Sequence, residues 1–413
     1  MKVKAGALYL SIIIALIIAM VCSSLLVLSY YFRLYYVQHQ REQRLQHNID
    51  AGLLIALNQS KNIDSLQLIN LYEQQGDSLL IRTEKWGLFK MVYLQTQIQN
   101  DTLSRILLVG NDSRHDQNVI YLSDEDRPLS ISGNTQIIGD VLLPRSGIKK
   151  AYVDGRPYTG LTMVDGDIKN SDNGLPMLDS TWIFSLQKHL TTLPVKTFGS
   201  STINRSFKVQ TLLYRADINT SLKQANLKGN IVISSDTTVQ IPADAKLDGI
   251  LIFAKQIRVK TGFRGNCQLF ATDSIIVEKN VIFDYPSCLG LLKQPDLITG
   301  NQPTITLAEQ VNFAGIIFSH EDKRSKLQTM ISIGKNSKIK GEVYAMGILK
   351  LANDVEVYGK VSCDRFLMQQ NASLYENYLF NVKLSRPSRS IYYLSSLLFN
   401  TAPIQQKVLK WLE

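Results

Sequence analysis

The sequence predicts a mainly β protein: a single N-terminal transmembrane helix and helical stalk, then a β-meander, a parallel β-helix (β-solenoid) of about 18 residues per coil, and a helical C-terminal cap. Two observations lead to this prediction. Residues 7–32 contain no charged side chain. Between residues 239 and 375, pairs of apolar residues recur with a period of 18 residues that two insertions lengthen.

Residues 7–32 are long enough to cross a lipid bilayer, for which about 20 apolar residues suffice. The apolar core of a cleaved signal peptide is shorter, so we expect an uncleaved anchor. Val21 precedes Cys22, which argues against a lipoprotein site, because such a site needs a small residue before the cysteine.

The charges that flank this anchor are nearly balanced, with Lys2 and Lys4 before it and Arg33, Arg41 and Arg44 after it. The positive-inside rule therefore gives only a small preference between the two orientations. We expect residues 1–32 to form a cytoplasmic tail and a single-pass anchor in the inner (cytoplasmic) membrane. The bulk of the chain is then extracytoplasmic, in the periplasm.

The N-terminal sequence KAGALYLSIIIALIIAM resembles the start of minor pilins and pseudopilins, which have a basic residue, a glycine and then a long apolar helix. Those families usually carry a glutamate five residues after the cleavage glycine. Here Ser11 stands in that place after Gly6. The resemblance implies a subunit of a pilus or secretion machine.

Beyond the anchor, residues 33–77 place apolar side chains at helical spacing among glutamine, arginine and histidine, which predicts a helical stalk. His39 and His47 share a face of this helix, but no acidic or cysteine ligand accompanies them, so we expect no metal site. Residues 78–125 alternate apolar and polar side chains between turn residues, which predicts antiparallel strands.

Residues 126–222 are expected to hold a first solenoid coil at 129–143 and then a long insertion. Within the insertion, the stretch PMLDSTWIFSLQKHL favours a helix over roughly 180–190. Asp179 or Ser180 is its candidate N-cap, because a short polar side chain there accepts from a free backbone N–H.

Residues 223–381 are expected to form the β-solenoid. Each repeat has apolar residues at offsets 0, +2, +6, +8, +12 and +14, a turn-forming residue at +5 and often glycine at +10. Alternation with period 2 puts each apolar pair on one face of a strand, and coils must stack to bury that face. The extra residues within 286–304 and 319–330 are expected to be loops. The repeats begin at Val239, Ile257, Ile275, Ile305, Ile331, Leu349 and Leu367.

Over roughly 239–375, the short strands with glycine at +10 resemble bactofilins, the polymer-forming β-helical cytoskeletal proteins. The resemblance implies a non-enzymatic scaffold and leaves self-association open. Bactofilins usually lack a long N-terminal anchor and an inserted domain, so their polymerisation is not carried over to this chain.

Residues 382–413 are expected to form a C-terminal cap of two helices, at 388–399 and 403–412, that covers the open end of the solenoid. The alternative is a membrane or partner contact through Trp411, with Lys407 and Lys410 beside it.

The net charge of +10 favours anionic partners such as phospholipid or an acidic glycan. No basic run with interleaved aromatic residues is present, so we expect no nucleic-acid partner. The four cysteines show no CxxC pair and are expected to be free core or loop thiols. Among them, Cys288 lies beside Pro286 in an expected loop and is predicted to be the most reactive.

The sequence contains no catalytic or nucleotide-binding motif, and we expect no cofactor, no metal and no enzymatic activity. One alternative is an envelope polysaccharide-active enzyme that uses Asp248 and Asp284. Offset +9 points outward and carries Asp248, Asn266 and Asp284 on successive coils. The two carboxylates would then lie roughly 10 Å apart, near the separation found in inverting glycosidases.

The sequence therefore favours a membrane-anchored, non-enzymatic structural or assembly protein of the bacterial cell envelope. Its partners are the bilayer, through residues 7–32, and an envelope protein or glycan.

Overall fold

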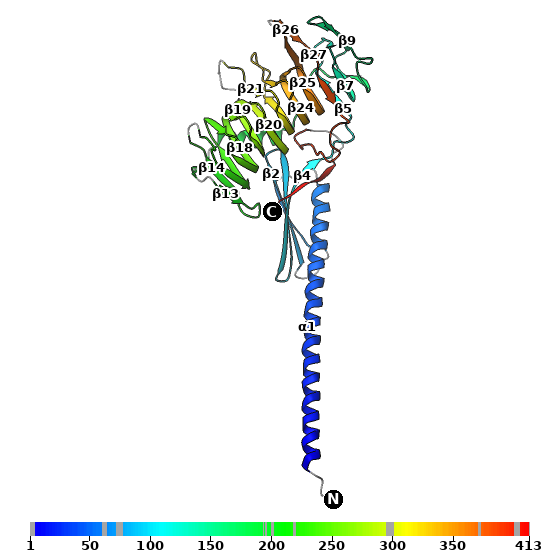
Figure 1. Cartoon of the computed structure of the whole chain (residues 1–413), viewed down its shortest axis with the longest axis vertical. Coiled ribbons are helices and arrows are strands. Elements are labelled where there is room, and N and C mark those ends of the chain that lie inside the picture. The colour runs from blue at the N-terminus through cyan, green and yellow to red at the C-terminus, as the bar shows by residue number, and fades with distance from the viewer. Residues whose placement is uncertain are drawn as a thin grey trace. The chain divides into compact units, whose positions relative to one another are not determined.

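The computed structural model describes residues 5–59, 64–71, 77–192, 194, 196–199, 202–217, 220–294, 301–370, 373–399 and 405–412. These residues form a mainly β protein with one long N-terminal helix (Figure 1). The chain forms two compact units. The first comprises Met1–Thr83 and Val92–Arg105, and the second comprises Glu84–Met91 and Ile106–Glu413.

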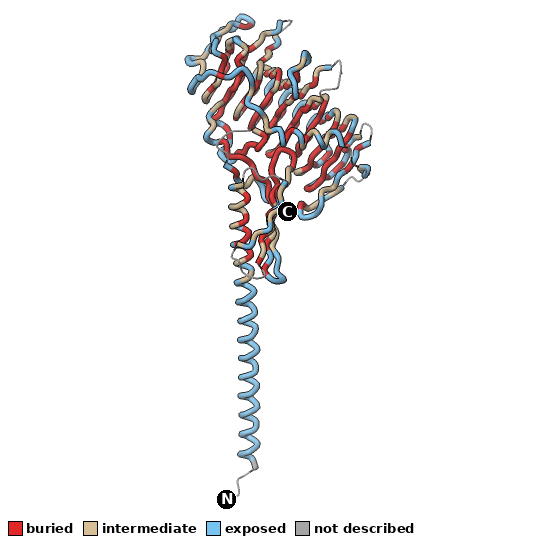
Figure 2. Tube along the Cα trace, turned by 180° about the vertical axis from the view of Figure 1, so that it is seen from behind, coloured by how far each residue is buried: buried red, intermediate tan, exposed pale blue. Residues whose placement is uncertain are grey.

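Helix α1 (Ala5–Asn58) dominates the first unit, with 54 residues uninterrupted by proline. Its residues 6–40 are exposed all round, and its later turns bury one face (Figure 2). Among the described residues, this is the helix that is long and apolar enough to cross a membrane. The expected stalk helix ends earlier than residue 77, because the alternating residues Ser65–Ile69 form a strand.

A sheet with the strand order β1-β2-β3-β4 follows α1. It lies where the alternating pattern of residues 78–125 predicted antiparallel strands, and β1 pairs antiparallel with β2. The later turns of α1 pack on it: a Cβ added at Gly52 would lie 2.8 Å from Leu79 Cδ1, and Thr96 Oγ1 donates to the carbonyl oxygen of Leu45 at 3.3 Å. The strands are β1 (Ser65–Ile69), β2 (Asp77–Trp86), β3 (Phe89–Ile98) and β4 (Asp101–Asn111).

The second unit is built around a closed sheet of mainly parallel strands. Its first strands, with a small neighbouring sheet and hairpin, are β5 (Asn118–Leu122), β6 (Leu129–Ser132), β7 (Gln136–Ile138), β8 (Asp140–Leu143), β9 (Ile148–Lys150), β10 (Tyr152–Val153), β11 (Arg156–Pro157) and β12 (Ile168–Asn170). The later strands are β13 (Thr202–Arg205), β14 (Leu212–Arg215), β15 (Asn226–Gly229), β16 (Ile231–Ser234), β17 (Thr238–Ile241), β18 (Lys246–Val259), β19 (Arg264–Val277), β20 (Ile282–Lys293), β21 (Thr304–Leu307), β22 (Asn312–Glu321), β23 (Met330–Ile333), β24 (Lys338–Leu351), β25 (Glu356–Gln370), β26 (Ser373–Glu376), β27 (Tyr378–Phe380) and β28 (Lys383–Ser385).

The register of these parallel strands follows the 18-residue period of the sequence. The first residues of successive repeats are register partners, and the side chains of all six are buried. This result confirms the phase of the repeat across both insertions. The partners are Val239 and Ile257, Ile257 and Ile275, Ile275 and Ile305, Ile305 and Ile331, and Ile331 and Leu349.

The last repeat is one residue out of phase with the prediction. Leu349 pairs with Phe366 and not with Leu367, because the register shifts between Ala345 and Ile348. Phe366 is accordingly buried and Leu367 is only partly buried. A β-bulge of this kind adds a residue on one strand and leaves no periodic trace in the sequence.

The first coil-like segment stacks at an unexpected end of the sheet. Strand β5 pairs with β25, where Ile120 meets Val361, and β7 pairs with β28, where Ile137 meets Leu384. The chain thus places residues 118–143 beside its last repeats and not beside β13, which follows in sequence. The apolar spacing is the same in both segments, so it does not encode which strand is the neighbour.

Helix α2 (Ser180–Thr191) confirms the helix predicted at 180–190, with Asp179 as the N-cap. The Asp179 carboxylate accepts from the Thr181 N–H at 2.8 Å. The helix buries Trp182, Ile183 and Leu186, and it contacts β18 and β19.

The two predicted C-terminal helices are wrong. Residues 388–399 form turns and short bridges, and β29 (Gln406–Leu412) pairs antiparallel with β4. The apolar residues of 388–399 have another cause: residues 393–398 are buried as a continuous run, while Ile391 and Tyr392 before them are exposed. Part of 403–412 lies outside the described residues.

The expected loop at 286–304 is also shorter than predicted, because β20 continues to Lys293. Cys288 is fully buried in this strand, as are Cys267 and Cys363 in theirs, and burial raises the pKa of all three thiols. The prediction that Cys288 is exposed and reactive is therefore wrong. Proline beside it suggested a loop, whereas Tyr285 and Pro286 lie at a register shift within the strand.

We expect a bulky maleimide to leave Cys267, Cys288 and Cys363 unmodified in the native, detergent-solubilised chain, because thiolate formation and access are both suppressed. Mass spectrometry of labelled peptides before and after denaturation checks this. Labelling of the same three thiols after denaturation is the positive control, because Cys22 lies in the apolar stretch that detergent covers. Rapid labelling of Cys288 in the native chain would contradict the buried position of β20.

Candidate functional site

Residues 386–399, here called the C-terminal strap, cross one strand of the parallel sheet after another. Arg389 Nη1 donates to Glu342 Oε1 on β24 at 2.9 Å. The Tyr393 hydroxyl donates to the carbonyl oxygen of Gly315 on β22 at 3.3 Å. The Tyr285 hydroxyl on β20 donates to the carbonyl oxygen of Leu394 at 2.8 Å. The strap therefore ties strands that are separated by many residues in sequence.

Glycine at offset +10 makes room for this crossing. Gly315, Gly341 and Gly359 are register partners, and their φ values of 143°, 145° and 154° lie in a region that side chains rarely adopt. A Cβ added at Gly341 would collide with the Gly315 carbonyl and would lie 3.0 Å from the Tyr393 ring. These three glycines, here called the glycine column, thus allow the strands to pair closely and leave room for the strap to pack on them.

A buried ion pair between Arg389 and Glu342 lies at the centre of the contact. Their side chains are 2% and 9% exposed. Arg389 Nη2 also donates to Ser113 Oγ at 2.9 Å, and its guanidinium lies 4.4 Å from the centre of the Tyr393 ring. The Ser395 hydroxyl donates to the second Glu342 oxygen. Both charges are therefore matched by hydrogen bonds that offset the loss of water.

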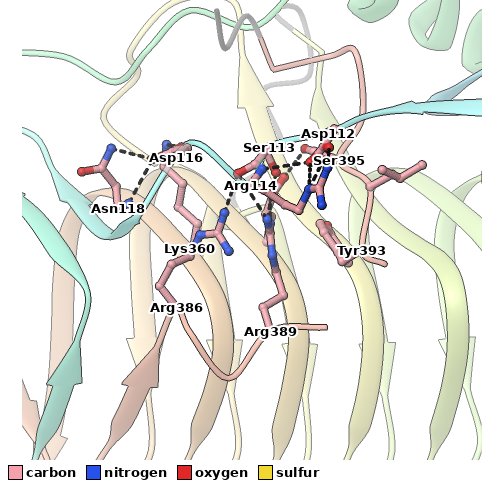
Figure 3. A network of polar contacts seen from close by, with 12 residues as sticks. Asp112, Ser113, Arg114, Asp116, Asn118, Lys360, Arg386, Arg389, Tyr393 and Ser395 are labelled. Atoms are coloured by element: carbon pink, nitrogen blue, oxygen red, sulfur yellow. Dashed lines mark hydrogen bonds and ion pairs between the residues drawn. The ribbon is translucent and has the colours of Figure 1, made fainter. Parts of the chain in front are cut away.

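A second ion pair extends this network. Lys360 Nζ lies 2.7 Å from Asp116 Oδ2, and Asp116 Oδ1 accepts from the Asn118 N–H and side-chain amide (Figure 3). Burial alone raises the pKa of Asp116, but the charge and hydrogen bond of Lys360 outweigh it and hold this pKa below its usual value. Asp116 is therefore ionised at neutral pH.

Arg386 is a buried cation in the same network. Its described hydrogen-bond acceptor is the carbonyl oxygen of Ser113, at 2.6 Å from Nη2. Burial and the nearby charge of Arg389 lower the pKa of Arg386. Burial also raises the pKa of Tyr285 and of Tyr393, so both hydroxyls stay protonated and remain donors at neutral pH. These groups hold the strap in place, because each is already engaged with a protein partner.

An open groove of about 510 Å³ lies beside the strap. Its volume is within the range of small-molecule sites, roughly 300–1,000 Å³. Its walls are aromatic, hydroxylated and basic. The lining residues are Tyr285, Ala314, Lys340, Ser388, Arg389, Ser390, Tyr392, Tyr393 and Leu409.

The predicted pair Asp248 and Asp284 lies on the outer surface of the sheet and does not line the groove, and both side chains are about half exposed. Asp248 lies 3.9 Å from Lys228 Nζ and 3.5 Å from Lys410 Nζ, and Asp284 lies 3.1 Å from Arg264 Nε. Their outward orientation agrees with the sequence prediction. Each carboxylate is paired with a cation of its own, an arrangement that favours a surface role over an acid and base pair.

The sequence reasoning missed Glu342, Arg389 and Tyr393. One signal was present: Glu342 and Lys360 occupy the same offset, +11, in adjacent repeats, and they are register partners. Charged side chains next to the glycine column at two successive levels indicate polar contacts on that face. Their partners on the strap are not visible from spacing.

No protein-family model, curated protein or solved structure matches the chain.

Near the strap, Lys90 on β3 is fully buried and donates to Gln406 Oε1 at 3.3 Å. Burial lowers the pKa of Lys90 to about 8. An unfolded lysine has a pKa of about 10.4, so between these values the unfolded chain binds more protons and the free energy of unfolding rises with pH.

We expect the free energy of unfolding of the wild type to rise by about 3 kcal/mol more than that of Lys90→Met by pH 10.5, because the variant has no amine to titrate at this position. Denaturant unfolding of the full chain in detergent between pH 7.5 and 10.5 measures it. The exposed Lys246→Met is the matched control and should follow the wild type. Identical pH slopes for wild type and Lys90→Met would contradict the burial of this amine.

Proposed function

We propose that the chain is a membrane-anchored, non-enzymatic structural or assembly protein of the bacterial cell envelope. In this proposal residues 7–32 of α1 span the inner membrane, and the second unit presents a β-solenoid scaffold in the periplasm. The observation that carries the proposal is the exposure of apolar residues along the first part of α1, from Gly6 to beyond Phe32. A helix with this surface is stable in lipid and not in water.

The register of the parallel strands supports a solenoid. Partners separated by 18 residues, lengthened to 30 and 26 at the two insertions, are what stacked coils produce. Such a ladder repeats its outward side chains at a fixed spacing, which suits a rigid display surface. The paired state of Asp248, Asp284, Glu342 and Asp116 supports a structural role rather than proton transfer.

A subunit similar to a minor pilin or pseudopilin is a second candidate, favoured by the packing of the first unit. The later turns of one long helix bury Leu45, Ile49 and Ala56 against an antiparallel sheet, while the apolar turns before them stay exposed. Ser11 still stands where those families usually carry a glutamate. Cleavage of a leader peptide after Gly6 therefore distinguishes a pilin-like subunit from a simple membrane anchor. The intact mass of the chain from its native membrane separates the two candidates: a mature N-terminus at Ala7 favours the pilin-like subunit, and an unprocessed chain favours the simple anchor.

A reporter that is active only outside the cytoplasm, fused after residue 413, tests the anchoring. We expect activity in the membrane fraction that resists alkaline extraction, because the helix remains in the bilayer. Deletion of residues 7–32 should leave the fusion soluble and inactive. If the full-length fusion is active but soluble, and its mature chain has lost residues 7–32, then these residues are a cleaved signal sequence and the anchor is refuted.

A further inference from the structure

We propose that the groove beside the strap binds an acidic saccharide, a glycan chain that carries carboxylate groups. The inference rests on the side chains of the second unit and does not depend on the membrane anchor. It assigns the groove a ligand whose ring faces, hydroxyls and negative charge each meet a matching group.

The groove arises from two local features of the repeat. Its floor contains Ala314 and Lys340, which are register partners and occupy the outward +9 position of successive repeats. Its wall contains Tyr285, which lies where the register between β20 and β22 shifts between Phe283 and Ser287. A bulge re-aims a side chain out of the regular alternation. The strap contributes Tyr392 and Tyr393 to the lining, with the Tyr393 ring packed against that of Tyr285.

Tyr392 is the aromatic side chain that can meet the face of a sugar ring, because Tyr393 is buried against Arg389 and Tyr285. Tyr285 and Tyr393 have ring centres 5.3 Å apart, and their hydroxyls are held by the sheet and the strap. Tyr392 is 82% exposed and lines the same groove. An exposed tyrosine offers a flat apolar face with a polar tip at little conformational cost, which suits a ligand that is apolar on its ring faces and hydroxylated at its edges.

The charge of the groove favours an anion. Lys340 is exposed, and the nearby carboxylates of Asp284 and Glu342 are neutralised by Arg264 and Arg389. Arg389 lines the groove, and its buried Nε has no hydrogen-bond partner among the described residues. The groove thus presents a surplus of positive charge beside its tyrosines. A carboxylate on a sugar ring would pair with Lys340 while the ring packs on Tyr392.

Isothermal titration calorimetry of the full chain in detergent, with a hyaluronan tetrasaccharide as the titrant, tests this proposal. We expect saturable binding that weakens at least tenfold in Tyr392→Ala and about fivefold in Lys340→Gln, and that falls with added salt. Both positions are exposed, so these variants should fold. The matched controls Tyr152→Ala and Lys246→Gln remove an exposed tyrosine and an exposed lysine outside the groove, and they should bind as the wild type does.

Two further ligands define the class. The uncharged chitotetraose should bind at least fivefold more weakly than the acidic tetrasaccharide, and tetraglutamate should not compete. Equal binding of chitotetraose would overturn the acidic preference. Competition by tetraglutamate, no saturable binding of hyaluronan up to millimolar concentration, or unchanged affinity in both groove variants would overturn the saccharide site itself.

Discussion

Val355→Asp should lower the free energy of unfolding by more than about 4 kcal/mol, because it places an unpaired carboxylate in the interior of the parallel sheet. Val355 is fully buried just before β25, and its carbonyl oxygen accepts from the Lys383 N–H at 2.9 Å. No cation among the described residues faces this interior position, which belongs to a wholly apolar core cluster. The neighbouring residue Glu356 points outward and pairs with Lys338 at 3.1 Å.

Glu356→Gln is the matched control, since it removes only a partly exposed ion pair and should cost about 1 kcal/mol or less. Thermal unfolding followed by circular dichroism compares the two variants with the wild type. Equal melting temperatures for Val355→Asp and Glu356→Gln would mean that the inward phase of the repeat is wrong.

The second large effect is expected at the buried ion pair of the strap. Arg389→Met leaves Glu342 charged and without its cation, and breaking a buried pair in this way costs about 3–5 kcal/mol. Ser113 would lose its charged partner as well, whereas Ser395 would still donate to Glu342. The strap should then loosen, because Arg389 carries its ionic link to β24 and Ser395 alone would remain bound to Glu342.

The double variant Arg389→Met/Glu342→Leu separates the pair from the surrounding packing. It removes both charges, so we expect it to recover about half or more of the lost stability. Hydrogen exchange of residues 386–399 reports this loosening directly. If the single variant costs less than about 1 kcal/mol and exchange of the strap is unchanged, the strap is not held by this pair.

The inward residues of the repeat could be predicted from the sequence because burial of a strand face imposes a period of 2, and stacking imposes a period of 18. Val239, Ile257 and Ile275 satisfy both conditions, and the structure places them in register. The periodic argument was wrong where a strand carries extra residues, as at Leu367 and Cys288. A bulge changes the phase without changing composition.

The C-terminal strap could not be predicted for a different reason. Its apolar residues were interpreted as helix faces, but they pack on strands that lie far away in sequence, such as β20 and β22. The polar cluster likewise joins Ser113, Glu342 and Arg389. These residues are close together because the strap crosses the sheet and because residues 118–143 pair with the last repeats. Local spacing contains neither piece of information.

The orientation of the chain in the membrane is the central claim, and site-directed labelling tests it most directly. Lys246→Cys places a thiol on an exposed position of β18, while Cys267, Cys288 and Cys363 are buried and add no background. Cys22 is changed to serine so that the new thiol is the reactive one. We predict that a membrane-impermeant maleimide labels this variant in intact spheroplasts to the same extent as after lysis. Labelling that appears only after lysis would place the β-rich unit in the cytoplasm and contradict the account.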